Sequence, residues 1–158
     1  MAKKAGELSH YDRSGHAHMV DVSAKAATHR EATASAFVAL SKKVLKALPK
    51  NPKGNPLEVA RIAGIQAAKR TSEFIPMCHP LPLTFIDVIT TVTNTGVSIT
   101  ASAATTANTG VEMEALTAAS IAALTIYDMT KALDKGIRIR HVQLIAKSGG
   151  KSGNWRRE

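Results

Sequence analysis

Apolar and polar residues alternate in several stretches of this 158-residue chain, as they do in β-strands. Residues 84–93 and 97–103 are rich in β-branched side chains and flank the turn sequence Asn94-Thr95-Gly96, which predicts a β-hairpin. Residues 19–22 and 137–146 show shorter patterns of the same kind and predict two further strands.

A first helix is predicted in the N-terminal third of the chain. Residues 28–31 have the spacing of a capping box, with Glu31 three positions after Thr28. Apolar residues then follow at helical spacing up to Pro49, so one helix is expected over about residues 28–48.

Two further helices are predicted downstream. Asn55 is a favourable N-cap ahead of Pro56, and this helix is expected to run to about Lys69. The run 111–133, rich in Ala, Leu, Ile and Met, predicts the longest helix, with Gly136 just past its end.

This order of elements mixes helices and strands without regular βαβ alternation. It predicts an α+β fold, with a largely antiparallel sheet packed against helices. The expected organisation is a mobile N-terminal tail over residues 1–17, one domain over 18–153 and a C-terminal tail over 154–158. Aromatic residues make up only 4%, so the core must be built from small aliphatic side chains, which favours further burial by oligomerisation.

The chain carries 21 Lys and Arg against 12 Asp and Glu, a net charge of +9. This excess favours a polyanionic partner, either nucleic acid or a phosphate-bearing metabolite, although a basic surface without a partner has the same composition. Cys78 is the only cysteine, and the six histidines have no helical ligand spacing, so no metal site is expected. No apolar run is long enough to span a bilayer and the start lacks a secretory signal, which predicts a cytoplasmic protein.

Cys78 and His79 lie between prolines, in the stretch 75–82 that is expected to form a stiff loop. His79 is suited to proton transfer near neutral pH, and Cys78 to nucleophilic attack or metal binding. A buried cysteine beside a loop histidine is an equally good interpretation of the residue types alone.

Glu112 and Glu114 flank Met113 at the predicted start of the long helix. Acidic residues are common there because they interact favourably with the helix dipole. Carboxylates at a loop–helix junction can also accept hydrogen bonds from a guanine edge or an amine.

Asp128 and Lys131 are three residues apart on a helix that is otherwise almost uncharged. One interpretation is a surface ion pair of little energetic consequence. The apolar surroundings instead predict a partly buried pair, in which burial moves the lysine pKa toward neutrality.

The sequence Lys147-Ser148-Gly149-Gly150-Lys151-Ser152-Gly153 has some features of a phosphate-binding loop, but Ile145 stands where a Walker A motif requires glycine. A P-loop nucleoside triphosphatase is therefore excluded. Glycines with Lys147 and Lys151 can still surround phosphates, although a disordered basic tail has the same composition.

Six motifs, in order along the chain, carry a resemblance to a known family. They are Met19-Val20-Asp21-Val22-Ser23, Ala60-Arg61-Ile62-Ala63-Gly64-Ile65, Ile75-Pro76-Met77-Cys78-His79-Pro80-Leu81, residues 109–117, Leu124-Thr125-Ile126-Tyr127-Asp128-Met129 and residues 147–153. Over roughly residues 19–153, the chain resembles the cyclic pyranopterin monophosphate synthase family of molybdenum cofactor biosynthesis.

This resemblance implies a lyase that converts 3′,8-cyclo-7,8-dihydro-GTP to cyclic pyranopterin monophosphate and releases diphosphate, with no redox cofactor. It also implies a ferredoxin-like α+β fold and a homo-oligomer, a hexamer built from dimers. Both Glu114 and Asp128 match active-site positions of the family, yet they are fourteen residues apart on one predicted helix, about 21 Å at 1.5 Å per residue, which predicts active sites between subunits.

The resemblance also implies the roles of particular residues. Asp128 and Lys131 are the expected catalytic acid–base pair. The expected substrate-binding residues are Arg30, Lys53, Met77, Cys78, His79, Glu112, Met113, Glu114, Lys147 and Lys151.

Two other functions remain as alternatives. A basic nucleic-acid-binding domain would use the positive charge, but one Trp and two Tyr offer little for base stacking, and no readout motif is present. A catalytically inactive homologue of the family is disfavoured because Asp128 and Lys131 are both present.

Overall fold

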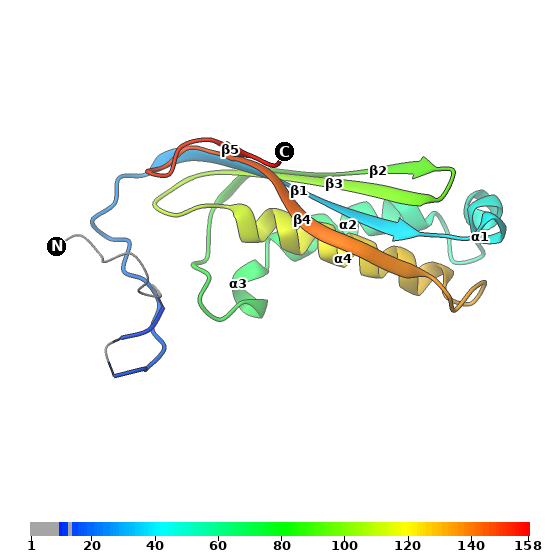
Figure 1. Ribbon diagram of the computed structural model, residues 1–158, viewed down its shortest axis with the longest axis horizontal. Helices are drawn as coiled ribbons and strands as arrows, with labels where there is room; N and C mark the ends of the chain where they lie inside the picture. Colours follow the sequence, from blue (N-terminus) through cyan, green and yellow to red (C-terminus); the bar gives the residue numbers. More distant parts are fainter. Residues whose placement is uncertain (1–9, 13) are drawn as a thin grey trace.

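Five antiparallel strands form one sheet in the order β2-β3-β1-β4-β5, and two long helices cover one of its faces (Figure 1). The computed structural model describes residues 10–12 and 14–158. The strands are β1 (Thr28–Ala39), β2 (Leu83–Thr93), β3 (Gly96–Ala107), β4 (Arg138–Ser148) and β5 (Trp155–Arg156). The helices are α1 (Lys42–Ala47), α2 (Pro56–Ala68), α3 (Thr71–Phe74) and α4 (Glu112–Thr130), with a 3₁₀ turn η1 at Leu48–Lys50.

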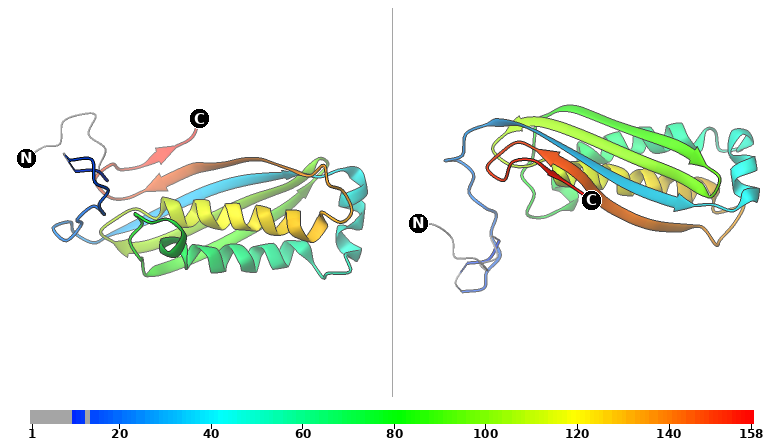
Figure 2. Two further views of the ribbon diagram at one scale, coloured as in Figure 1. Left: turned by 90° about the horizontal axis from the view of Figure 1, so that it is seen from below. Right: turned by 45° about the horizontal axis from the view of Figure 1, so that its top comes forward.

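The long elements follow one another as β1, α2, β2, β3, α4 and β4, the βαββαβ order of a ferredoxin-like fold. α2 and α4 lie side by side against the sheet, and no helix of residues 10–12 and 14–158 covers its opposite face (Figure 2). The predicted α+β class, with an antiparallel sheet packed against helices, is confirmed.

The helix predicted over residues 28–48 is wrong, because most of this stretch is the central strand β1. Ala32, Ala34, Ala36 and Val38 alternate along it, and each is at most 2% exposed. β1 pairs with β3 on one side and with β4 on the other, so its alternating buried residues all face the core. This pairing outweighs the helical preference of alanine and selects a strand.

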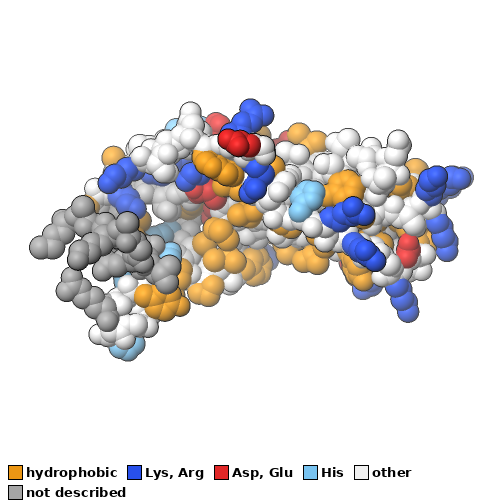
Figure 3. Space-filling view, viewed as in Figure 1, with side chains coloured by type: hydrophobic (Ala, Val, Ile, Leu, Met, Phe, Trp, Pro, Cys, Tyr) orange, Lys and Arg blue, Asp and Glu red, His pale blue; other side chains and the backbone are white. Residues whose placement is uncertain are grey.

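A short helix does follow, after Ser41, whose hydroxyl oxygen accepts a hydrogen bond from the Val44 backbone N–H at 3.5 Å. This helix, α1, carries the exposed Lys42, Lys43 and Lys46, and Figure 3 shows basic side chains gathered at this end of the molecule.

The second predicted helix is confirmed as α2. The Asn55 side chain caps it by accepting hydrogen bonds from the N–H groups of Leu57 and Glu58, at 3.0 and 3.3 Å. Pro56 occupies the first turn, where its missing N–H costs nothing, and Lys69 is the C-cap.

The hairpin, the long helix and the last strand are also confirmed, as β2–β3, α4 and β4. The strand predicted over residues 19–22 is wrong. This segment passes the end of α4, where Val20 and Val22 line a cavity, and the Val22 carbonyl accepts a hydrogen bond from the Asn108 amide at 3.2 Å.

Small residues let α2 and α4 approach each other closely. Gly64 of α2 faces Ala118 and Ala122 of α4, both fully buried. A Cβ atom on Gly64 would come within 2.8 Å of the Ala118 carbonyl oxygen, so only glycine fits without a shift. The aromatic-poor composition thus gives a thin core in which helix backbones lie near one another.

Lys147 and Ser148 follow the strand predicted over residues 137–146, and in the structure they are the last residues of β4. β5 then pairs with β4, and the Arg157 backbone N–H donates to the Ile145 carbonyl at 2.8 Å. The prediction of a mobile N-terminal tail falls partly on residues 1–9 and 13, outside the described residues. Among the helices of residues 10–12 and 14–158, none combines the length and apolar character needed to cross a bilayer.

Candidate active site

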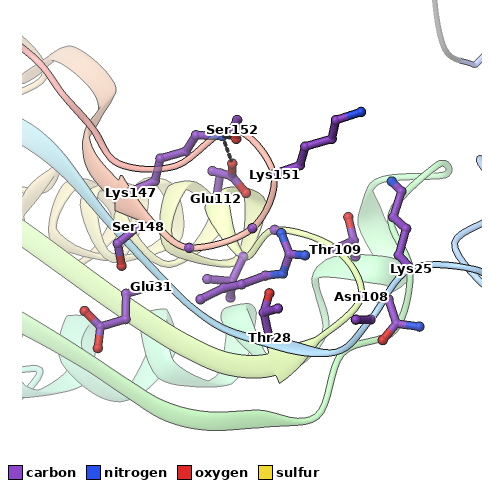
Figure 4. A pocket seen from close by; sticks show the side chains of 16 residues that line it. Lys25, Thr28, Glu31, Asn108, Thr109, Glu112, Lys147, Ser148, Lys151 and Ser152 are labelled. Carbon is purple, nitrogen blue, oxygen red and sulfur yellow. Dashed lines mark hydrogen bonds and ion pairs between the residues drawn. The ribbon is translucent and has the colours of Figure 1, made fainter. Parts of the chain in front are cut away.

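Four basic side chains line a cavity of about 610 Å³ near the N-terminal end of α4: Lys25, Arg30, Lys147 and Lys151. We call this the basic cavity. Lys147 comes from β4 and Lys151 from the loop after it, while Lys25 reaches the cavity from the segment that precedes β1, on the opposite side (Figure 4). The charge and the position of this cavity are suited to a polyphosphate.

Glu112, in the first turn of α4, balances part of this charge. Its Oε1 accepts a hydrogen bond from Lys147 Nζ at 2.8 Å, and Lys147 also donates to the Ser152 hydroxyl at 3.1 Å (Figure 4). Burial raises the pKa of Glu112, but the hydrogen bond and charge of Lys147, together with the charge of Arg30, outweigh it, so the pKa is lowered overall. Glu112 is therefore ionised and holds Lys147 over the cavity.

The glycines of the 147–153 loop are required by its path. Gly149 and Gly150 have φ angles of +84° and +71°, in the left-handed region. A side chain on Gly149 would collide with the His29 carbonyl oxygen, and one on Gly150 with the Arg30 guanidinium. The loop thus lies directly against β1 and leads into β5 instead of a helix, which agrees with the exclusion of a P-loop.

A second cavity, of about 350 Å³, adjoins the first, and we call it the Cys–His cavity. Cys78 and His79 line it from the proline-bounded loop, as predicted from sequence, and Glu114 lines it from α4. Met77 and Met113 supply apolar walls. The two cavities share Lys25, Thr109, Gly110 and Glu112, so one elongated ligand can occupy both.

Glu114 is the most strongly perturbed acid of this cavity. It is 4% exposed, and burial raises its pKa to about 7, with the charge of Glu112 adding to the rise. Burial and the charge of Glu114 in turn raise the pKa of the Cys78 thiol. Glu114 can therefore gain or lose a proton near neutral pH, as a general acid–base group must.

Asp128 and Lys131 lie at the other end of α4. Asp128 Oδ1 and Lys131 Nζ are 2.7 Å apart, and Lys53 Nζ donates to the Asp128 carbonyl oxygen at 3.4 Å. The hydrogen bond and charge of Lys131, with the charge of Lys53, lower the pKa of Asp128. We call these three residues the distal cluster.

The prediction that the Asp128–Lys131 pair is partly buried is wrong for the single chain. The side chains of Asp128 and Lys131 are 61% and 52% exposed. The hydrogen bond and charge of Asp128 raise the lysine pKa, the opposite of the expected move toward neutrality. Ile126 and Met129 face the core, whereas this pair, like the half-exposed Leu124, lies on the solvent side of α4.

The structure therefore divides the predicted site residues between the two ends of α4. Nine of the twelve line the two adjoining cavities, and three form the distal cluster. Along the helix axis the groups are about 20 Å apart at 1.5 Å per residue.

Three residues near the cavities were not predicted from sequence: His10, Lys25 and Asp21. His10 and Lys25 line the cavities, and Asp21 has a lowered pKa because Ser23 donates hydrogen bonds to it and His79 lies nearby. All three belong to the segment before β1. Within the described residues, no three His, Cys, Asp or Glu side chains come together as they would around a metal ion.

Comparison with known proteins decides the family. A sequence profile of the MoaC family matches residues 19–150. The chain belongs to the MoaC family. The cyclic pyranopterin monophosphate synthase of Thermomicrobium roseum is 54% identical over 96% of this chain and 94% of its own length. The proteins named cyclic pyranopterin monophosphate synthase 2 from Mycobacterium bovis and Mycobacterium tuberculosis are each 51% identical, over 98% of this chain and 93% of their own length.

The MoaC family match confirms the resemblance seen in the six sequence motifs. It spans both ends of α4, and so includes the cavity residue Glu114 as well as Asp128 and Lys131 of the distal cluster. None of the proteins compared here favours a nucleic-acid-binding domain.

Proposed function

We propose that this MoaC-family protein is a lyase of molybdenum cofactor biosynthesis that converts 3′,8-cyclo-7,8-dihydro-GTP to cyclic pyranopterin monophosphate and releases diphosphate. Identity above 50% over nearly the whole chain to proteins named for this product supports the assignment. The observation that carries it is the pair of adjoining cavities, one basic and one lined by acid–base groups. A substrate made from GTP also favours a cytoplasmic location.

The two cavities match the two parts of the proposed substrate. The triphosphate binds in the basic cavity, where Arg30, Lys147 and Lys151 supply positive charge. The purine-derived ring system binds in the Cys–His cavity, where Glu112 and Glu114 accept hydrogen bonds from its N–H groups.

The reaction opens one ring, closes another and forms a cyclic phosphate, so it needs proton transfers at several atoms. Glu114, with a pKa of about 7, supplies a group that exchanges protons near neutral pH, and the His79 imidazole lines the same cavity. Lys131 acts as a charged acid, and Asp128 fixes its ammonium group by the 2.7 Å ion pair. Lys53 adds a further positive charge beside this pair.

The separation of these groups along α4 leads us to propose that the active site is shared between two copies of the chain. One subunit supplies the cavities, and the distal cluster of a second subunit completes them. Ile62 on α2 and Leu124 on α4 are each about half exposed in the single chain, as are Phe85 and Ile89 on the uncovered face of the sheet. Burial of these side chains favours a homo-oligomer, and we propose a hexamer built from dimers.

The test of the proposed activity is direct. The purified protein is incubated with 3′,8-cyclo-7,8-dihydro-GTP, and the products are analysed by mass spectrometry and a diphosphate assay. Equal amounts of cyclic pyranopterin monophosphate and diphosphate are expected. Substrate that remains intact, or pterin formed without diphosphate, would contradict the proposal.

A further inference from the structure

A small hairpin precedes the first strand of the sheet and is held by its own hydrogen bonds. The His18 backbone N–H donates to the His10 carbonyl at 2.9 Å, and Tyr11 and Ala17 form a β-bridge beside it. The Asp12 carboxylate accepts hydrogen bonds from the N–H groups of Ser14 and His16, at 2.8 and 2.9 Å. These contacts fix the backbone of His10 within the hairpin.

His10 is the one histidine of this hairpin that lines the Cys–His cavity. Its Nδ1 atom is buried, and among the described residues no group hydrogen-bonds to it. Buried polar atoms are almost always paired, so this unpaired ring nitrogen, on a residue that lines the cavity, points to a partner that occupies the cavity. His16 and His18, in contrast, are exposed.

The surroundings of His10 are chemically suited to a polar ring system. The charged and titratable groups that share the cavity are Lys25, Cys78, His79, Glu112 and Glu114. Val20, Val22 and Leu81 supply apolar contacts. An imidazole nitrogen either donates or accepts a hydrogen bond according to its tautomer, and a purine-derived ring carries both kinds of partner at its edge.

We propose that His10 is a substrate-binding residue, and that its Nδ1 hydrogen-bonds to the purine-derived ring in the Cys–His cavity. The inference rests on the proposed function, because it takes the substrate to be the cyclised GTP derivative. It assigns part of the ring specificity to the N-terminal hairpin, outside the residues 19–150 matched by the family profile.

Four variants test this assignment in the full-length protein. In His10→Ala, kcat/KM is expected to fall about tenfold, mostly through KM, because a hydrogen bond made in both the ground state and the transition state is lost. His10→Asn places an amide near the position of Nδ1 and should recover most of the loss, whereas His10→Gln places its amide farther out and should not. His18→Ala, which removes an exposed side chain across the same hairpin, should match the wild type.

A role confined to folding would give a different pattern. His10→Ala and His10→Asn would then lose kcat/KM in proportion to their loss of stability, measured by urea unfolding, and Asn would not rescue. That pattern, or a His10→Ala protein with kcat/KM within twofold of the wild type, overturns the assignment.

Nitrogen-15 NMR of the histidine rings provides a test that needs binding but not turnover. In a Lys131→Ala protein mixed with the cyclised GTP derivative, the Nδ1 signal of His10 should shift while that of His18 does not. An unchanged His10 signal in the presence of bound substrate overturns the inference. If the wild-type protein binds this compound without converting it, the proposed function is contradicted. The shift of the His10 signal then still tests whether His10 contacts the bound compound.

Discussion

Glu114 and Asp128 lie on one unbroken helix, α4, and are about 21 Å apart along its axis at 1.5 Å per residue. Glu114 is buried at the wall of the Cys–His cavity, while Asp128 is exposed at the opposite end of the helix. A single substrate molecule cannot contact both residues in one chain. We therefore propose that the two residues act in the same reaction from two different chains.

Lys131→Ala and Asp128→Ala should each lower kcat by about 10²–10⁴-fold, the usual contribution of an acid–base group. Their stability should remain close to that of the wild type, because both side chains are more than half exposed and an exposed ion pair contributes little. Turnover assays and urea unfolding measure the two effects. Lys135→Ala, at an exposed position just beyond the helix, is the matched control; near-normal turnover in either test variant would refute the catalytic assignment.

Glu114 should make the folded protein less stable as the pH rises. Its pKa is raised from 4.5 to about 7 on folding, so between these values the folded protein retains a proton that the unfolded chain has released. The free energy of unfolding should therefore fall by about 3 kcal/mol from about pH 4.5 to 7 on account of this one residue.

Urea unfolding across this pH range measures the effect. Glu114→Gln should remove this part of the pH dependence, since the amide does not titrate, and Glu73→Gln on the surface of α3 should leave it unchanged. A Glu114→Gln protein with the same pH dependence as the wild type would show that burial does not raise this pKa.

Lys147→Glu should weaken substrate binding by about 10²-fold, because it places a carboxylate beside Glu112 and removes a cation from the basic cavity. Calorimetric titration of the substrate into Lys131→Ala proteins with and without Lys147→Glu measures the loss of affinity without turnover. Lys46→Glu, which makes the same change of charge on α1, should bind nearly normally. Equal losses in the two variants would mean that net charge, and not the basic cavity, governs binding.

Gly64→Ala should destabilise the protein by about 1–3 kcal/mol, although alanine is the better helix former. The added Cβ would press against the Ala118 carbonyl oxygen and the Val88 side chain, both in the packed core. Thermal or urea unfolding measures the change, and Gln66→Ala on the exposed side of α2 serves as the control. A gain in stability would show that α2 can move away from α4 at no cost.

The sequence predicted best those elements whose signals are local. The Asn55 cap of α2, the hairpin turn at residues 94–96 and the length of α4 all depend on residues close together in the chain. β1 was missed because its small side chains permit either structure, and only pairing with β3 and β4 selects the strand.

The same distinction applies to the candidate site. Residues in the recognised motifs, such as Cys78 and Glu112, were found from sequence and do line the cavities. His10 and Lys25 were not, because neither was assigned a role in the recognised motifs and the position of their segment against α4 depends on tertiary contacts. The exposure of the Asp128–Lys131 pair was also missed, because an apolar neighbour such as Ile126 is buried on the other side of the helix, whereas Leu124, on the side of Asp128, is itself half exposed.

We propose that the two ends of α4 meet in one active site between two chains. Mixed oligomers test this shared site most directly. Glu114→Ala and Lys131→Ala proteins, each inactive, are dissociated, mixed and reassembled, with mixed oligomers verified by native mass spectrometry. Each mixed two-fold interface then holds one intact site and one doubly altered site, so a random 1:1 mixture should regain about a quarter of wild-type turnover. A mixture of Asp128→Ala and Lys131→Ala, altered at the same end, should stay inactive. If verified Glu114→Ala and Lys131→Ala mixed oligomers show no turnover, the site is not shared between chains.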